Sequence, residues 1–358
     1  MKKCFYELAT DQRHGIIDAP VKLLLGILSV FYFCAVRVIL VLYRFGILKQ
    51  RVLPKPVISI GNMTLGGTGK TPLVEFVARA LRDKGVKSAV LIRGYMDKNS
   101  AGLSNNTASD EAVLLKELLK DIPVFVGADR FRSGQEALKN NSIDVFLLDD
   151  GFQHWKLKRD LDIVAIDASR PFGNGFLIPR GILREPLSSL SRAGIFIITK
   201  SDLDYSNLEK IYNCLRKINP KAIVAESIHK PIAFINLSKS NSSVGLSALK
   251  SKSACLLCSI ADPNAFKQTV LNLGVNLRKE FTFIDHYIYR KNDVMSVVEF
   301  CKQNKIESVI STQKDAVKLM KYVDCFKDGP DLLSLSIKIE LIKGKDEVIS
   351  RITSMCLR

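Results

Sequence analysis

The sequence predicts an α/β fold in which helices cover both faces of a mostly parallel sheet. A smaller α/β domain follows this sheet, and an apolar helix precedes it. Three observations predict the architecture. Short apolar runs alternate with helical patterns from residue 57 to residue 198, as in parallel sheets whose strands are joined by helices. A shorter alternation follows residue 250, and the apolar run 23–43 carries only one charge, that of Arg37.

The apolar run at 23–43 is long enough for membrane contact. A helix needs about 20 apolar residues to cross a bilayer, and Arg37 lies off-centre, where its side chain can reach a head group. Basic residues flank both ends of the run, so positive charge gives no orientation. Three interpretations stay open: a spanning helix, a helix lying in the interface, and a core helix of a soluble protein. We expect residues 1–50 to form a membrane-associated helical segment.

The first α/β alternation defines a domain that we place at 51–230. Residues 72–84 show an apolar stripe at helical spacing. The other helical patterns are at 112–119 and 132–139, and the strand-like runs are at 57–60, 88–92, 124–126, 145–148, 163–166 and 195–198. Since strands and helices alternate, a parallel sheet covered on both faces is expected.

A composition change near residues 230–250 predicts a second domain. This stretch is rich in Ser, Lys and Asn, which is typical of a linker or hinge. Strand-like runs at 254–259, 281–283 and 308–311 then alternate with helical patterns at 263–273 and 292–303. We therefore expect residues 231–358 to form a smaller α/β domain that contributes to the functional site.

The loop after the first strand has the pattern of a phosphate-binding loop. Residues 61–72 read GNMTLGGTGKTP, with glycines that let backbone N–H groups curl around an anion. Lys70 would contact the β- and γ-phosphates, and the Thr71 hydroxyl would bind Mg²⁺. The standard P-loop has glycine six residues before the lysine, where this chain has Thr64. The predicted nucleotide-binding residues are Thr64, Leu65, Gly66, Gly67, Thr68, Gly69, Lys70 and Thr71. Strand, loop and helix together predict a P-loop NTPase-like fold.

Two adjacent acids follow the strand-like run 145–148, namely Asp149 and Asp150. A carboxylate at a strand end near a P-loop is where such proteins hold Mg²⁺ or its water. The alternative is a strand end with solvated acids. We expect a Mg²⁺ site here, without choosing between the two aspartates.

The chain is strongly basic, with 53 Lys and Arg against 36 Asp and Glu and a net charge of +17. Such a surface attracts nucleic acid, anionic lipid or a phosphorylated substrate. The sequence lacks zinc-finger spacing, an RNP-like aromatic motif and a long Lys/Arg run, so no nucleic-acid partner is expected.

Longer motifs resemble those of the tetraacyldisaccharide 4'-kinase family. The most specific is LDDGFQHW at 148–155. Others in family order are RGY at 93–95, SDE at 109–111, RDL at 159–161, FGNG at 172–175, LREP at 183–186, DHY at 285–287 and TQKD at 312–315. Ala112 replaces a family proline, and the segment 259–263 matches its motif poorly. The resemblance covers nearly the whole chain.

The resemblance implies transfer of the γ-phosphoryl group of ATP to the 4'-hydroxyl of a tetraacylated glucosamine disaccharide 1-phosphate. It implies ATP and Mg²⁺ as cofactors, and the acylated disaccharide and cytoplasmic-membrane lipids as partners. It also implies the inner membrane of a Gram-negative bacterium, with the catalytic domain facing the cytosol. A basic, membrane-seated protein suits a phosphorylated lipid substrate.

The family motifs imply roles for individual residues. They point to Asp110 as the base that accepts the hydroxyl proton, oriented by His286 of the second domain. A helix-capping role with Thr107 is the alternative for Asp110. Arg130 and Arg184 would contact phosphate, where surface salt bridging is the alternative. Glu185 would assist the metal ion, and His154 would contact nucleotide or substrate.

Two other functions compete. Residues 199–202 read TKSD, which half matches the N-K-x-D motif that reads guanine, so a membrane-associated P-loop GTPase or partition-type ATPase is the alternative. A scaffold with an inactive P-loop is the third, and the intact Lys70, Thr71 and acid pair argue against it.

Overall fold

The computed structural model describes residues 8, 10–11, 18–94, 110–202 and 205–356. They form two compact units. The first consists of Met1–Ile228 together with Glu340–Arg358, and the second is His229–Ile339. The sequence predicts one domain over residues 231–358, whereas the segment after residue 339 belongs to the first unit. Each unit is described by itself below.

Seven strands of the first unit lie side by side in the order β7-β6-β5-β1-β4-β2-β3, and every pair is parallel. Their bounds are β1 Val57–Asn62, β2 Ser88–Ile92, β3 Val124–Val126, β4 Val145–Asp149, β5 Leu161–Asp167, β6 Ile195–Thr199 and β7 Ile223–Asn236. β1 lies in the centre, where Ile58 pairs with Leu147 and with Leu161. β1, β2, β4, β5 and β6 are buried throughout, which explains why they appear in the sequence as continuous apolar runs.

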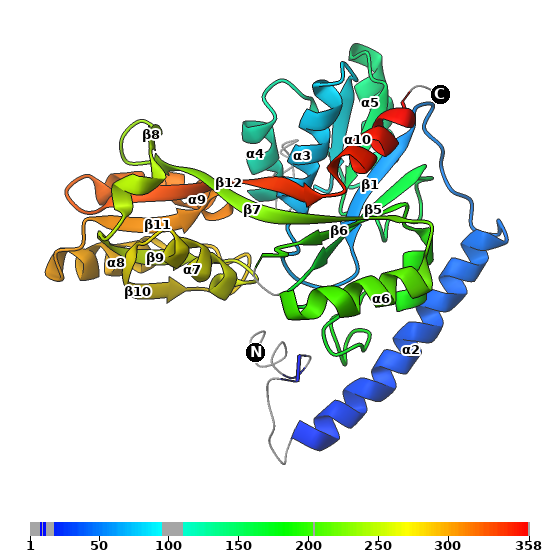
Figure 1. Cartoon of the computed structure of the whole chain (residues 1–358), viewed down its shortest axis with the longest axis horizontal. Coiled ribbons are helices and arrows are strands. Elements are labelled where there is room, and N and C mark those ends of the chain that lie inside the picture. Colours follow the sequence, from blue (N-terminus) through cyan, green and yellow to red (C-terminus); the bar gives the residue numbers. More distant parts are fainter. Residues whose placement is uncertain (1–7, 9, 12–17, 95–109, 203–204, 357–358) are drawn as a thin grey trace, which may run out of the picture. The chain divides into compact units, whose positions relative to one another are not determined.

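Helices cover both faces of this sheet (Figure 1). They are α3 Lys70–Arg82, α4 Asp110–Leu118, α5 Arg130–Asn140, α6 Leu208–Ile218 and α10 Lys345–Ser354, with the 3₁₀ turn η1 Leu187–Arg192. α3 contacts β1, β2 and β4 and also packs against α10. α5 covers one apolar cluster through Ala137, and α6 covers another through Ile211 and Leu215. The sheet, the helices and the P-loop position confirm the predicted fold class.

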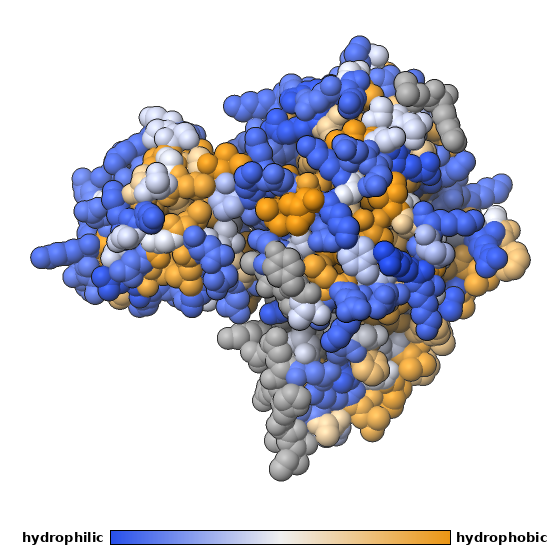
Figure 2. Space-filling view, viewed as in Figure 1, coloured by the Kyte–Doolittle hydropathy of each residue, from blue (hydrophilic) through white to orange (hydrophobic). Residues whose placement is uncertain are grey.

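Helix α2, Asp18–Arg44, lies along the first unit with one side packed and the other exposed. Val36 and Ser29 are buried, and the Tyr32 ring packs on the apolar cluster under α6. The outer side forms an apolar strip along the lower right edge of Figure 2. Among the described residues, α2 alone is long and apolar enough to cross a membrane. Because few of its residues are buried, it is not an interior core helix.

The second unit is a smaller α/β assembly. Its parallel strands lie in the order β10-β9-β11-β12, and β8 pairs antiparallel with the end of β7. The bounds are β8 Ser242–Val244, β9 Ser253–Cys258, β10 Asn276–Thr282, β11 Ser308–Thr312 and β12 Asp331–Lys343. The helices are α7 Pro263–Asn272, α8 Lys291–Gln303 and α9 Gln313–Leu319, with 3₁₀ turns η3 Leu246–Leu249 and η4 Met320–Phe326.

The stretch 230–250, predicted to be a linker or hinge, contains regular structure in both halves. β7 continues to Asn236, β8 follows, and η3 ends the stretch. The β7 segment contains Lys230 and Pro231, and a proline inside a run argues against a strand. Alternating burial along this part of β7 also removes the continuous apolar signal that revealed the central strands.

Candidate active site

The P-loop connects the central strand β1 to helix α3. α3 begins at Lys70, two residues before the predicted start, with Gly69 in the left-handed region at φ 79°. Thr64 and Thr68 are buried. The carbonyl of Thr68 accepts a hydrogen bond from Thr199 Oγ1 at 3.0 Å. The loop therefore lies between the end of β6 and the amino terminus of a helix, where phosphate binding is favoured.

The first half of the P-loop pairs with the segment that contains the LREP motif. Leu65 N donates to the carbonyl of Ile182 at 2.8 Å, and Arg184 N donates to the carbonyl of Met63 at 2.8 Å. Arg184 is thus brought beside Lys70 although 114 residues separate them in the sequence.

Lys70 and Arg184 converge on Asp150. Lys70 Nζ lies 3.7 Å from Asp150 Oδ1, and Arg184 Nη1 lies 2.9 and 3.0 Å from the two carboxylate oxygens. Burial would raise the pKa of Asp150, but Lys70 and Arg184 outweigh it and hold that pKa below its usual value. Asp150 thus stays ionised between two cations that can also bind phosphate.

Asp149 has a different environment. It is buried at the end of β4, opposite Ile60 of β1. Its Oδ1 has no hydrogen-bond partner among the described residues. Burial raises its pKa to about 7, Lys70 opposes the rise, and Asp150 and Glu111 add to it. A buried carboxylate with an unsatisfied oxygen is suited to bind a cation.

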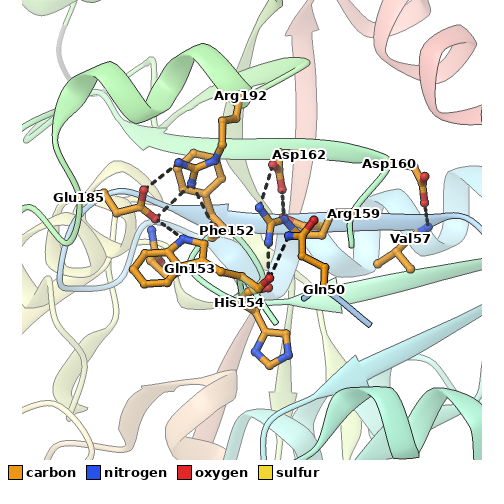
Figure 3. Close-up of polar contacts among 12 residues, drawn as sticks. Gln50, Val57, Phe152, Gln153, His154, Arg159, Asp160, Asp162, Glu185 and Arg192 are labelled. Atoms are coloured by element: carbon orange, nitrogen blue, oxygen red, sulfur yellow. Dashed lines mark hydrogen bonds and ion pairs between the residues drawn. The ribbon is translucent and has the colours of Figure 1, made fainter. Parts of the chain in front are cut away.

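Glu185 is fully buried and already paired. Its carboxylate accepts from Arg192 Nη1 at 2.9 Å, from Arg192 Nη2 at 3.1 Å and from Trp155 Nε1 at 3.2 Å (Figure 3). The Arg192 guanidinium also lies over the Phe152 ring, 4.4 Å from its centroid. These contacts fix Arg192 and Trp155 around the Glu185 carboxylate, and the metal role of Glu185 stays a prediction.

The DDGFQHW motif packs its side chains around the P-loop. Gln153 Nε2 donates to the carbonyl of Asn62 at 2.9 Å, and Gln153 Oε1 accepts from Arg184 Nη1 at 3.1 Å. The glycine at the end of β1 is needed for close approach, because a Cβ on Gly61 would come within 2.6 Å of Phe152 Cβ. The motif therefore joins the P-loop to Arg184.

His154 belongs to the same motif. Burial lowers its pKa to about 4, and the positive charge of Arg130 contributes to that lowering. A neutral imidazole at physiological pH can accept or donate a hydrogen bond but adds no charge.

Asp110 and Arg130 each begin a helix of the first unit. Asp110 is the first residue of α4, and its neighbour Glu111 raises the pKa of Asp149. Arg130 is buried at the start of α5 and lowers the pKa of Asp150. Both helix starts therefore lie within electrostatic range of the acid pair. Thr107, and with it the capping alternative for Asp110, lies outside the described residues.

His286 lies in the second unit, in the turn before α8, with φ 61° and an exposed side chain. Its Nε2 lies 3.7 Å from Asp285 Oδ2 and 3.4 Å from Lys314 Nζ. Lys314 Nζ also contacts Asp285 Oδ1 at 3.2 Å. Because Asp110 and His286 belong to different units, their pairing stays a prediction.

Several residues near the site had no predicted role, namely Gln153, Trp155, Arg192 and Tyr32. The first two stand within the motif that carried the resemblance, so the motif itself was the available signal. No signal in the sequence marked Arg192, which stands in a polar turn, or Tyr32, which stands in an apolar helix.

Known proteins share these features. The family model described as Tetraacyldisaccharide-1-P 4'-kinase matches residues 21–356. The chain is 34% identical to the tetraacyldisaccharide 4'-kinase of Halothermothrix orenii, covering 91% of each chain. It is 37% identical to that of Elusimicrobium minutum, covering 86% of this chain and 84% of the other.

A solved structure is similar over the same length. The crystal structure of LpxK from Aquifex aeolicus in complex with ATP matches with a TM-score of 0.72 and 28% identity, covering 93% of this chain and 99% of that one. The P-loop, the acid pair and the full-length match agree, and the chain belongs to the tetraacyldisaccharide-1-phosphate 4'-kinase family.

Proposed function

We propose that this kinase phosphorylates the 4'-hydroxyl of a tetraacylated disaccharide 1-phosphate by direct transfer from ATP, a step of lipid A biosynthesis. The hydroxyl oxygen forms a bond to the γ-phosphorus, the bond to the β–γ bridging oxygen breaks, and ADP leaves. The hydroxyl proton passes to the Asp110 carboxylate, which His286 orients. The observation that carries the proposal is the convergence of Lys70 and Arg184 on Asp150 beside the unsatisfied Asp149.

The protein's own groups act on charge and geometry. Lys70 and Arg184 neutralise the oxygens of the transferred phosphoryl group, where charge develops in the transition state. Before ATP binds, Asp150 holds both cations in place. Gln153 directs Arg184 through its hydrogen bond to Nη1. Arg130 adds positive potential around the same phosphates.

The residues present also fit a magnesium ion. Asp149 supplies a buried, unsatisfied oxygen, and Thr71 supplies a hydroxyl at the start of α3. No group of three His, Cys, Asp or Glu side chains within the described part of the chain is arranged to hold a metal ion. Few protein ligands suit Mg²⁺, which commonly keeps waters and binds substrate phosphates. Asp149 and Thr71 would hold the ion, which would help to neutralise the negative charge of the phosphates.

We place the enzyme on the cytosolic side of an inner membrane. The outer side of α2 is apolar, the chain is basic, and the acylated substrate remains in the bilayer. The packed side of α2 favours a helix lying in the interface over a spanning one, because Ser29 and Val36 contact protein in the middle of the apolar run.

A phosphate-transfer assay tests the proposal. Purified protein in mixed micelles is given labelled ATP and the disaccharide monophosphate, and the product is identified by mass. We expect one added phosphate at the 4' position, with GTP a poor donor. Lys70→Ala should reduce kcat by on the order of 10²-fold or more, because Lys70 acts on developing charge. Preference for GTP, or near-normal turnover by Lys70→Ala, would contradict the proposal.

A further inference from the structure

Helix α2 makes two hydrogen bonds to a single segment of the first unit. Ser29 Oγ donates to the carbonyl of Leu177 at 2.8 Å, and Tyr32 OH donates to the carbonyl of Arg184 at 2.8 Å. Ser29, Tyr32 and Val36 recur at helical spacing and form the packed side of α2. The segment that they hold, residues 174–184, we call the bridging segment.

The bridging segment is also hydrogen-bonded to the P-loop. Thr64 and Leu183 form an isolated antiparallel β-bridge between the P-loop and the bridging segment. The hydrogen bonds from Leu65 N to the carbonyl of Ile182 and from Arg184 N to the carbonyl of Met63 lie on either side of it. The segment therefore lies between α2 and the phosphate loop, and it contacts both through hydrogen bonds.

A third contact joins the amino-terminal part of the chain to the bridging segment. The Asp11 carboxylate accepts from Asn174 Nδ2 at 2.9 Å and from Arg180 Nη2 at 3.0 Å. Asp11 also pairs with Lys22 of α2 at 2.8 Å. Asp11 therefore links Asn174 and Arg180 of the bridging segment to Lys22 of α2.

Three groups of Arg184 make hydrogen bonds: its backbone N–H, its backbone carbonyl and its guanidinium. Its N–H is bound to Met63, its carbonyl accepts from Tyr32, and its guanidinium contacts Asp150 and Gln153. Burial raises the pKa of the Tyr32 phenol, and Glu185 adds to the rise, so the hydroxyl remains a donor. A catalytic group misplaced by about 1 Å can cost 10²-fold in rate.

We propose that Tyr32 is a positioning residue that acts through Arg184, so that the membrane-facing helix supports the geometry of phosphoryl transfer. The inference rests on the proposed function, in which Arg184 contacts the transferred phosphate. It gives α2 a second role, because the helix that seats the enzyme on lipid also fixes the backbone that carries a phosphate-binding cation.

The test removes one oxygen atom. Tyr32→Phe keeps the ring that packs on the core and the apolar surface of α2. We expect kcat to fall roughly 3- to 10-fold, the effect of one hydrogen bond of ordinary strength. KM for ATP and sedimentation with phosphatidylglycerol vesicles should stay within error. Tyr43→Phe is the matched control, because it makes the same change on the same helix, where the ring contact with Trp155 survives.

A double-mutant cycle then separates positioning from general packing. In an Arg184→Ala background, Tyr32→Phe should cause little further loss, because the cationic side chain that it positions is gone. Ser29→Ala removes the hydrogen bond from α2 to the carbonyl of Leu177. The kcat of this variant measures the effect of loosening the helix without changing the bond to Arg184. Equal losses from Tyr32→Phe in both backgrounds, or unchanged kcat, would overturn the inference. An inactive wild-type protein would instead contradict the proposed function.

Discussion

Asp149 and Asp150 are neighbours with opposite electrostatic environments. Asp150 is ionised between Lys70 and Arg184, whereas burial raises the pKa of Asp149 to about 7. This difference favours Asp149 as the cation ligand of the proposed mechanism, a choice that the sequence left open. In the proposed mechanism, Asp150 positions Lys70 and Arg184 until ATP binds to them.

The raised pKa of Asp149 has a consequence for stability. In the unfolded chain the group ionises near pH 4, and in the folded protein it does so near pH 7. Between these values the folded state holds the extra proton, so the free energy of unfolding falls as pH rises. We expect Asp149→Asn to raise it by roughly 1–3 kcal/mol at pH 8 without nucleotide, measured by urea unfolding.

A second buried aspartate provides the control for that measurement. Asp162 is buried but accepts hydrogen bonds from Arg159 Nε at 2.8 Å and from Ser59 Oγ at 2.6 Å. Asp162→Asn should therefore destabilise the protein. If both variants lose stability, Asp149 is satisfied by a partner and its proposed metal role fails.

At the scale of elements, α2 combines a packed side with an exposed apolar side. Its exposed residues include Leu23, Leu24, Ile27, Val30, Phe31 and Val38. A contiguous exposed apolar surface on a soluble protein commonly marks a contact surface. Because the Tyr32 ring packs on the core of the first unit, the helix belongs to the fold as well as to the proposed membrane contact.

Substitutions on the two sides of α2 should therefore differ. Val30→Ser with Phe31→Ser should strongly reduce binding to anionic vesicles and leave the thermal midpoint nearly unchanged, because both side chains are exposed. Deleting residues 1–50 should remove membrane binding and also leave the protein poorly soluble, since the core loses Tyr32 and Val36. Vesicle sedimentation and thermal unfolding check both outcomes. A soluble, stable deletion variant would show that α2 is only an anchor.

The sequence predicted elements well where one periodicity dominates. Buried parallel strands such as β4 and β6 appear as continuous apolar runs, and α3 appears as a regular stripe. β12 and α10 were not predicted: β12 is buried continuously only over Leu332–Leu335, and α10 buries only Val348 and Ile352. The P-loop and the acid pair could be predicted because phosphate binding fixes residue type and spacing. The Glu185–Arg192 pair could not, because only the folded turn brings those two charges together.

At the scale of the whole molecule, the proposed chemistry needs both units. Asp110 begins a helix of the first unit and His286 stands in the second. Within the second unit Lys314 and Asp285 already contact the His286 ring. If Asp110 and His286 share one site, the arrangement is complete only when the units close on substrate, which also excludes water.

Mutational coupling between the units tests this mechanism. Asp110→Ala and His286→Ala should each reduce kcat by roughly 10²-fold or more. The double mutant should be little worse than the poorer single mutant, because each change disables the same catalytic pair of residues. ATP affinity should change little in all three. Measured kcat and nucleotide binding for the four proteins complete the cycle, and fully additive losses would show that the two residues act independently.

The return of the chain to the first unit has a consequence for biosynthesis. α10 packs against α3, the helix that begins with Lys70, and Lys343 pairs with Glu226 at 3.2 Å. A nascent chain emerges from the ribosome with its amino terminus first, so α3 leaves the ribosome long before α10. The helix that begins with Lys70 therefore gains its contact with α10 only after the whole second unit has been synthesised. A polypeptide that stopped after residue 339 would leave the α10-binding side of α3 uncovered.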